Sequence, residues 1–484
     1  MTSTPRLALT ALASPSRDVP AGAGPCAPRR ALLLAAAGSL AAGCSSTPPS
    51  GPSATPASAA PLPPEAYSYA NRGWALNAVG GRGGRLIRVT TLAADGPGSL
   101  RAAVEASGPR IVVFEVGGTI DLGGRNLVIK EPQLTIAGQT APSPGISVIK
   151  AEITISTHDV VIQHLRIRPG EYGRAKRSGG DMDGITTLSG ARDLIVDHCS
   201  LSWATDENLS ASGPRFNGAT PDDWRRATAH RITYSNNLVY EGLSHSVHEK
   251  GEHSKGTLIH DNATGVLIYR NVYVSNRERN PLFKGGARGA IINNLVFNPG
   301  TLAMHYNLWA REWEGQPYQT GRLAVIGNVL RHGPDTATGT GLFTMRGHGD
   351  LELHAADNLA FDRAGATAPL FVDRRETQPQ PPRVLALPQP DLPPGLALVA
   401  AAAVEQQLPR TAGARPWDRD AIDTRLLREL AAGRGRIIDS EAQVGGYAVQ
   451  VATRRAFDPA QWHLDDMSPR AGWSSITALT QPQA

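Results

Sequence analysis

The sequence predicts an all-β fold, a parallel β-helix in which short strands wind into successive coils. Glycine (51) and proline (37) are frequent among the 484 residues, as expected of a chain with many turns. Amphipathic helical patterns are few. Short aliphatic segments recur at steps of 34, 39, 34, 23, 34 and 30 residues, the length of one supersecondary unit in a solenoid.

The recurring segments share one pattern, in which a polar residue stands between aliphatic residues. The polar positions are His164, His198, Asn237, Asn271, Asn294, Asn328 and Asn358. Short strands with no helix between them exclude a βαβ array. We predict that the asparagines stack along the coil and satisfy one another's buried amides. Surface turn positions are the alternative.

The first 44 residues predict an export signal. Arg29 and Arg30 precede the apolar run 31–42, which is too short to span a bilayer and fits a signal core. The run ends in AAGC, which resembles a bacterial lipoprotein signal with lipidation at Cys44. An ordinary cleaved signal with Cys44 unmodified is the alternative. We therefore expect an exported protein, either a cell-surface or periplasmic lipoprotein or a secreted one.

The segment that follows is rich in Ser, Pro and Ala, and it predicts a linker over residues 45–65. The folded β-helix domain is then expected over residues 66–376. Near its start, GSLRAAVEASG predicts a helix with Ser99 as N-cap and Gly108 as stop. This helix is placed to cover the open end of the solenoid, which otherwise exposes apolar side chains.

Residues 377–484 begin with a Pro-rich stretch and predict a tail that packs back on the coil. Within the tail, residues 418–433 predict a helix that starts at Asp418 or Asp420 and ends at Gly433. A separate small domain is the alternative for this segment.

The charge balance limits the possible partners. Of the formal net charge of +5, the first 44 residues carry +3, from four arginines and one aspartate, and the remainder carries +2. We expect no nucleic-acid partner, and an anionic ligand must be met by a local cluster. Outside the leader the chain has a single cysteine, Cys199, so no internal disulfide is expected. We expect a monomer that contacts a membrane only through a lipid at Cys44.

Two acidic clusters fall on successive repeats. Asp181 and Asp183, in GGDMDGI, can converge on one hard cation, although Asp in a Gly-rich loop is usually a turn former. Asp206 and Glu207 lie just past an apolar strand, where their side chains can reach solvent. Within that strand, His198 is interpreted as a core histidine.

A third cluster is basic. Lys255 lies in HSKG, and Arg277, Arg279 and Lys284 lie in SNRERNPLFKGG. Any one of them could be a solvated surface charge. In a solenoid, matching loops of consecutive turns lie about 4.8 Å apart, so the acids and bases would form one groove. A cation at one end and a cationic wall at the other would suit an acidic polymer and stabilise charge at its α-carbon.

Several of these segments, in this order, resemble the pectate lyase family of right-handed parallel β-helices, polysaccharide lyase family 1. The resemblance runs from about Gly80 to Gly300. It is carried by GGRGGRLIRVTTLAADGPGSLRAAVEASGPRIVVFEVGGTIDL, LTIAGQTAP, LIVDHCSLSW, HSKG and RNPLFK, with weaker similarity at GRIIDSEAQVGGY. It implies cleavage of polygalacturonate by calcium-assisted β-elimination. In this reaction calcium bridges protein and uronate carboxylates, and an arginine takes the C5 proton.

The resemblance also implies roles for the basic residues. Arg279 matches the catalytic arginine, and Lys284 stands in place of the second, substrate-binding arginine, which keeps the charge but loses the bidentate fork. Lys255 matches a substrate-binding lysine. Arg277 has no matching family role and is assigned to substrate binding.

The acidic clusters match the calcium ligands of the family. Asp181 and Asp183 match its Asp-x-Asp pair, and Asp206 matches a later acid. Ser210 replaces a further Asp that many members carry, and Glu207 is expected to compensate for that change.

Three functions remain open from the sequence. The first is a pectate lyase, and the second is a lyase for another uronate polymer, which the departures at Lys284 and Ser210 allow. The third is a non-catalytic surface protein that binds uronates. A substrate panel separates the first two, and turnover excludes the third. A hydrolase is disfavoured, because no pair of acids is placed as acid and base.

Overall fold

The computed structural model describes residues 62, 66–69, 71–375, 381–471 and 473, all of which belong to one compact unit, Pro61–Ala484. The predicted leader, the lipidation site Cys44 and nearly all of the predicted linker lie outside these residues. Within the described ranges, no helix combines the length and apolar character needed to cross a membrane.

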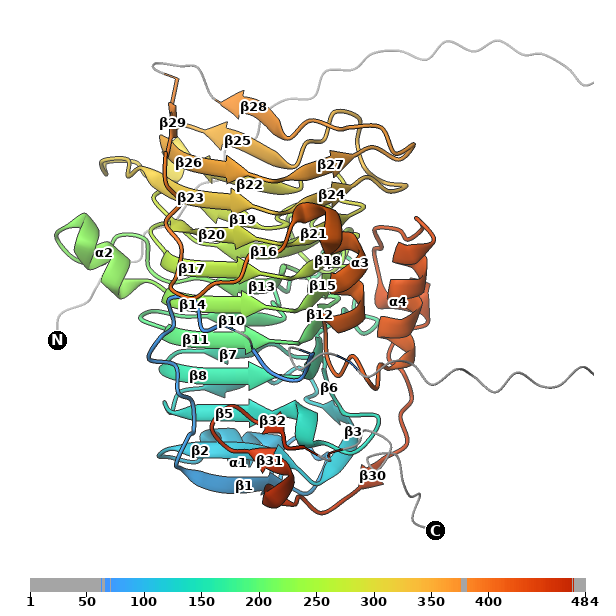
Figure 1. The fold of residues 1–484 in the computed structure, drawn as a ribbon. Coiled ribbons are helices and arrows are strands. Elements are labelled where there is room, and N and C mark those ends of the chain that lie inside the picture. The colour runs from blue at the N-terminus through green and yellow to red at the C-terminus, as the bar shows by residue number, and fades with distance from the viewer. Residues whose placement is uncertain (1–61, 63–65, 70, 376–380, 472, 474–484) are drawn as a thin grey trace, which may run out of the picture. The chain divides into compact units, whose positions relative to one another are not determined.

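Three parallel sheets form the walls of a right-handed β-helix (Figure 1). The eleven-stranded sheet contains β1 (Arg85–Val89), β2 (Arg110–Phe114), β5 (Leu134–Ala137), β8 (His158–Gln163), β11 (Arg192–Asp197), β14 (His230–Ser235), β17 (Thr264–Tyr269), β20 (Arg288–Ile292), β23 (Gly321–Ile326), β26 (Leu351–Ala356) and β29 (Val384–Ala386). The nine-stranded sheet contains β4 (Leu127–Ile129), β7 (Ile153–Ile155), β10 (Ile185–Thr187), β13 (Glu207–Ala211), β16 (Lys255–Ile259), β19 (Leu282–Lys284), β22 (Met304–Leu308), β25 (Phe343–Gly347) and β28 (Phe371–Arg375).

The third, ten-stranded sheet completes each coil. It contains β3 (Val116–Asp121), β6 (Ile146–Ile149), β9 (Leu165–Arg168), β12 (Ser200–Ser202), β15 (Leu238–Tyr240), β18 (Val272–Val274), β21 (Leu295–Phe297), β24 (Val329–Arg331), β27 (Leu359–Phe361) and β30 (Thr453–Arg454). Strand β30 pairs antiparallel with β3, whereas the coil strands pair in parallel. A separate two-stranded sheet is formed by β31 (Trp462–His463) and β32 (Ser468–Pro469). The predicted parallel β-helix is confirmed.

Among the described residues, four α-helices and several 3-10 turns accompany the sheets. They are α1 (Leu100–Glu105), α2 (Pro221–Ala227), α3 (Ala401–Thr411), α4 (Ala421–Ala431), η2 (Gly138–Thr140), η3 (Ala310–Glu312), η4 (Glu441–Val444) and η5 (Pro459–Gln461). Ser99 caps α1 as predicted, because its hydroxyl accepts from the N–H of Ala102 at 3.2 Å. Leu100 and Val104 of α1 are buried in the main core, so α1 covers the first coil. The sequence predicted neither α2 nor α3.

The predicted asparagine stack is confirmed. From Asn237 through Asn271, Asn294 and Asn328 to Asn358, each Nδ2 donates to the next Oδ1, at 2.9, 3.1, 3.0 and 3.1 Å. Every side chain in the stack therefore has a partner, which a buried amide requires.

His198 does not belong to the asparagine stack. The pairing of Asp197 with Ser235 aligns His198 with the residue before Asn237, which explains the irregular 39-residue step. His198 is buried, and its ring stacks on His164 with ring centroids 4.9 Å apart. Its interpretation as a core histidine is confirmed.

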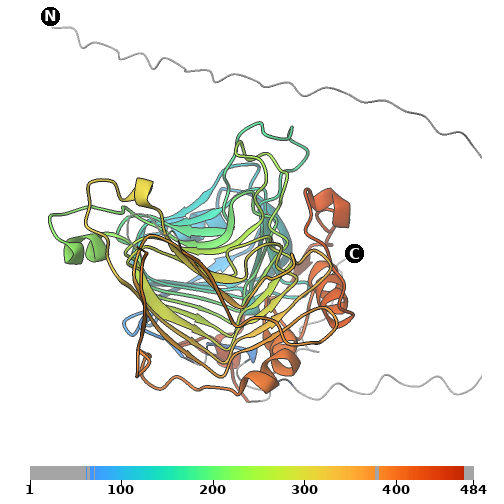
Figure 2. The same ribbon diagram turned by 90° about the horizontal axis from the view of Figure 1, so that it is seen from above.

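Helices α3 and α4 of the C-terminal tail pack on the outer face of the ten-stranded sheet (Figures 1 and 2). Val404 of α3 and Leu426 of α4 share a buried cluster with Tyr240 and Val272 of the coil. Helix α4 begins after Asp420, whose carboxylate accepts from the N–H of Asp423 at 2.9 Å. Of the two predicted starts, Asp420 is therefore the N-cap.

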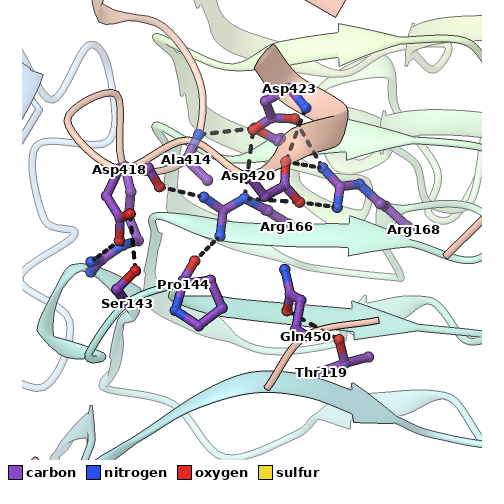
Figure 3. A network of polar contacts seen from close by, with 12 residues as sticks. Thr119, Ser143, Pro144, Arg166, Arg168, Ala414, Asp418, Asp420, Asp423 and Gln450 are labelled. Atoms are coloured by element: carbon purple, nitrogen blue, oxygen red, sulfur yellow. Dashed lines mark hydrogen bonds and ion pairs between the residues drawn. The ribbon is translucent and has the colours of Figure 1, made fainter. Parts of the chain in front are cut away.

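A buried ion network fastens α4 to the coil (Figure 3). Arg168, on β9, donates to Asp420 at 2.6 and 3.2 Å and to Asp423 at 2.9 Å. Arg166, two residues earlier, lies 3.6 Å from both acids and donates to the carbonyl of Asp418 at 2.9 Å. These arginines and both acids of α4 are buried, so each charge depends on its partners.

Replacing Arg168 with methionine is expected to lower the free energy of unfolding by about 3–5 kcal/mol, because two buried carboxylates lose their main partner. Urea denaturation measures it. The matched control is Arg331→Met, which removes a partly exposed ion pair to Glu405 of α3 and is expected to cost at most about 1 kcal/mol. Equal losses of unfolding free energy in the two variants would contradict the stabilising role of the buried network around Arg168.

Candidate active site

Most of the predicted site residues lie on, or directly before, four adjacent strands of the nine-stranded sheet, β10, β13, β16 and β19. Asp183 lies just before β10, and Glu207 is the first residue of β13. Glu207 pairs in register with Lys255, the first residue of β16. Lys255 in turn bridges to Glu278, which directly precedes Arg279. Because neighbouring strands lie about 4.8 Å apart, successive coils bring acids and bases together on one sheet edge.

Three carboxylates form a group that fits a cation. Ligand oxygens of Asp183, Asp206 and Glu207 all lie within 4.8 Å of one another. Asp183 is buried, and its two oxygens accept from the N–H of Glu207 at 3.0 Å and from the hydroxyl of Ser210 at 2.6 Å. Asp181 is exposed and does not belong to this group, so the structure brings together three of the four predicted ligands.

The electrostatics of these acids are unequal. Burial raises the pKa of Asp183 well above its ordinary value, and the nearby charge of Asp206 adds to the rise. Burial acts in the same direction on Asp206. There it is outweighed by a hydrogen bond from His253 and by the charge of Arg279, which together lower the pKa of Asp206. Concentrated buried negative charge of this kind is stabilised by a bound cation.

Arg279 lies against the carboxylate group and forms an ion pair with Glu207. Burial lowers the pKa of Arg279 from its ordinary value, against the opposing charges of Asp206 and Asp183. Two buried amides fix its loop, since Asn276 Nδ2 donates to Asn280 Oδ1 at 3.1 Å, on either side of Arg279. The guanidinium is therefore both partly desolvated and held in place.

The other predicted basic residues each have an acidic partner. Lys255 is buried and forms an ion pair with Glu278. Lys284 is buried between Asp261, 3.4 Å away, and Glu312. The predicted cationic wall is thus neutralised along its length, and an anionic ligand must exchange with these acids.

Arg277 points elsewhere. Its guanidinium contacts Glu252 at 2.7 Å, across the loop that precedes β16. The partners Asp261 and Glu312 were missed because their segments carry no motif, and Glu252 was missed although it directly precedes HSKG. Glu278 stood in the quoted basic segment but was not recognised as the partner of Lys255.

Two histidines were also missed at the site. Nε2 of His253 lies 3.3 Å from Asp206 Oδ1, and Nε2 of His248 lies 3.8 Å from Asp206 Oδ2. The signal was present in the sequence, because His253 belongs to HSKG and His248 lies five residues earlier.

A C-terminal segment braces the two loops that carry these residues. Asp439 accepts from the N–H of His245 at 2.9 Å, in the loop before β16. Glu441 accepts from the N–H groups of Glu171 and Tyr172 at 3.1 and 2.8 Å, in the loop before β10. The two loops also bond each other, since the N–H of Gly179 donates to the carbonyl of Val247 at 2.9 Å. The weakly similar motif GRIIDSEAQVGGY therefore stabilises the two loops that carry the site residues.

Known proteins resemble the chain over most of its length. A probable pectate lyase C of Aspergillus terreus is 34% identical over 387 residues, which covers 77% of this chain and 80% of that protein. The corresponding protein of Aspergillus flavus is 33% identical over 380 residues, with the same coverage of each chain. No family model matches.

Solved structures also align with the chain. Jun a 1, the major allergen of cedar pollen, aligns with a TM-score of 0.49 and 16% identity over 71% of this chain and 92% of its own. A pectate lyase from Bacillus sp. N165, solved with trigalacturonate, aligns with a TM-score of 0.45 and 15% identity, over 70% and 98%.

The identity to the two Aspergillus proteins extends over four-fifths of their length. It therefore spans the coil strands and the loops that carry the candidate site, beyond isolated motifs. The chain belongs to the pectate lyase family, polysaccharide lyases that act by β-elimination.

Proposed function

We propose that the protein is a calcium-dependent lyase that cleaves polygalacturonate by β-elimination, with Arg279 as the base. The observation that carries this proposal is the contact between the carboxylate group and the guanidinium, made through Glu207. A cation site and a partly desolvated base thereby adjoin each other.

The donor set fits calcium. Asp183, Asp206 and Glu207 offer oxygens only, and calcium takes six to eight oxygen ligands. The hydrogen bonds that Asp183 accepts and the ion pair that Glu207 makes leave further lone pairs on each carboxylate. A calcium ion held by these acids would supply positive charge that neutralises a substrate carboxylate and makes the adjacent C5 hydrogen more acidic.

The protein residues then carry out the elimination. A guanidine nitrogen of Arg279 takes the C5 proton, and the electrons of the C5–H bond form the C4–C5 double bond. The C4–O bond breaks with its electron pair on the glycosidic oxygen, which takes a proton from water. Burial favours the neutral base form of Arg279, while its ion pair with Glu207 opposes it. Sharing Glu207 with a cation weakens that opposition. Lys255 and Lys284 hold substrate carboxylates in exchange for their present acidic partners.

Product analysis tests this function. Polygalacturonate and polymers of other uronic acids are each incubated with the protein and calcium, and the fragments are weighed by mass spectrometry. We expect fragments of polygalacturonate with one unsaturated end. Unsaturated fragments from a different polymer alone would move the assignment to that polymer. The replacement of a bidentate arginine by Lys284 allows this outcome. Binding without cleavage would leave a uronate-binding protein.

We further propose that the protein is exported and anchored through a lipid on Cys44, on the strength of the leader pattern. Replacing Cys44 with alanine is expected to move the protein from the membrane fraction to the soluble fraction. Immunoblots of separated fractions measure the shift, and an unchanged distribution would contradict the anchor.

A further inference from the structure

Asp206 is shared by two groups of side chains. On one side it belongs to the three-carboxylate group with Asp183 and Glu207. On the other it lies within 4.8 Å of ring nitrogens of His248 and His253. Both histidines are buried and come from the loop before β16, which the C-terminal segment braces. The proposed mechanism uses neither of them.

The hydrogen bonds of the two rings show which atoms face Asp206. The backbone N–H of Lys250 donates to Nδ1 of His248 at 3.1 Å, so the neutral ring carries its hydrogen on Nε2, which faces Asp206 Oδ2. In His253, Nδ1 lies 3.2 Å from the carbonyl oxygen of Glu252, and Nε2 lies 3.3 Å from Asp206 Oδ1. Each oxygen of the carboxylate therefore faces one imidazole nitrogen.

The two rings also support each other. Their centroids are 3.6 Å apart, and their planes are inclined by 19°. Because the rings stack and His248 also accepts at Nδ1 from the backbone, neither ring can rotate without losing a contact. The carboxylate of Asp206 thus lies against a rigid surface.

We propose that His248 and His253 are positioning residues for the calcium ligand Asp206, fixing its carboxylate for the bound ion. This inference rests on the proposed calcium dependence. Partners that orient a metal ligand from outside the coordination sphere typically contribute about 10- to 100-fold to metal affinity. His253 makes the shorter contact, so its contribution is the larger of the two.

Direct binding of a transition metal by both imidazoles is the competing arrangement, since imidazole suits zinc and nickel better than calcium. The structure disfavours it at His248. Nε2 of His248 carries a hydrogen while the N–H of Lys250 occupies Nδ1, so ligation would require the loss of that bond.

Isothermal titration of the full chain with calcium chloride tests the inference without relying on activity. We expect His253→Leu to raise the calcium Kd about 10- to 100-fold. His253→Gln keeps an N–H donor and is expected to stay within a few-fold of the wild type. His248→Leu is expected to show a smaller rise than His253→Leu. The matched control is His245→Leu, in the same loop but exposed and without contact to Asp206.

Thermal melts of each variant in chelator exclude loss of folding as the cause. If the wild type binds calcium and a folded His253→Leu variant binds it with the same Kd, the positioning role alone is overturned. A wild type that binds no calcium would overturn the proposed calcium dependence as well. Tight zinc binding that both histidine variants abolish, with calcium binding unaffected, would overturn positioning in favour of direct ligation.

Discussion

Replacing Arg279 with alanine is expected to lower kcat on polygalacturonate about 10²- to 10⁴-fold, the usual contribution of a positioned general base. The reason is that the partly desolvated guanidinium adjoins the carboxylate group where the substrate would lie. Initial rates of unsaturated-product formation at saturating calcium measure the effect. Because alanine also leaves the buried Glu207 without its partner, a thermal melt of the variant must accompany the kinetics.

The control for Arg279 is Arg322→Ala, an arginine of the eleven-stranded sheet whose partner is Glu352 at 2.6 Å. Its activity is expected to equal that of the wild type. A folded Arg279→Ala that keeps kcat within tenfold of the wild type would remove Arg279 from the chemistry.

Replacing Asp183 with asparagine is expected to change calcium affinity and stability in opposite directions. The amide keeps the oxygen that accepts from Glu207, and the hydroxyl of Ser210 can turn to accept from the new NH₂ group. Loss of one charged ligand removes several kcal/mol of metal-assisted stabilisation, so activity at fixed, subsaturating calcium is expected to fall by about 10³-fold. The activity assay across a calcium titration measures it.

In chelator, by contrast, Asp183→Asn is expected to melt at a higher temperature than the wild type. Burial raises the pKa of Asp183, which means that its charge destabilises the folded state when no cation is bound. The neutral amide removes that cost. A variant that loses both calcium affinity and stability would show instead that Asp183 acts mainly as a structural hydrogen-bond acceptor.

The repeat pattern was enough to predict the fold. Aliphatic segments around recurring asparagines specify both the buried face of each strand and the column of amides, and both are local features of the sequence. The predicted register was wrong by one residue at His198, because a histidine at a similar step looks like a member of the same column. Only strand pairing shows that His198 stacks on His164 instead.

The candidate site was predicted in part. Asp183, Asp206, Glu207 and Arg279 come together because the coil places matching loops side by side. The acidic partners of the basic residues were not predictable in the same way. Glu312, for instance, reaches Lys284 from the 3-10 turn η3 after β22, and its position depends on tertiary packing.

The brace provided by Asp439 and Glu441 shows a second limit of sequence reasoning. These residues lie far from the site along the chain, and their motif suggested similarity without a role. Their contacts with the two site loops depend on how the tail crosses the coil, which the packing of α3 and α4 determines. Conversely, the α4 N-cap was predictable as one of two residues, because capping is local.

The most direct test of the account is the ultraviolet absorbance of unsaturated uronide during one incubation of the wild-type protein with polygalacturonate. Calcium is present at the start, excess chelator is added, and calcium is then restored. We predict that absorbance rises, stops and rises again. A rise that continues in excess chelator would contradict calcium dependence. The absence of any rise with a folded protein would contradict the assignment of polygalacturonate as the substrate.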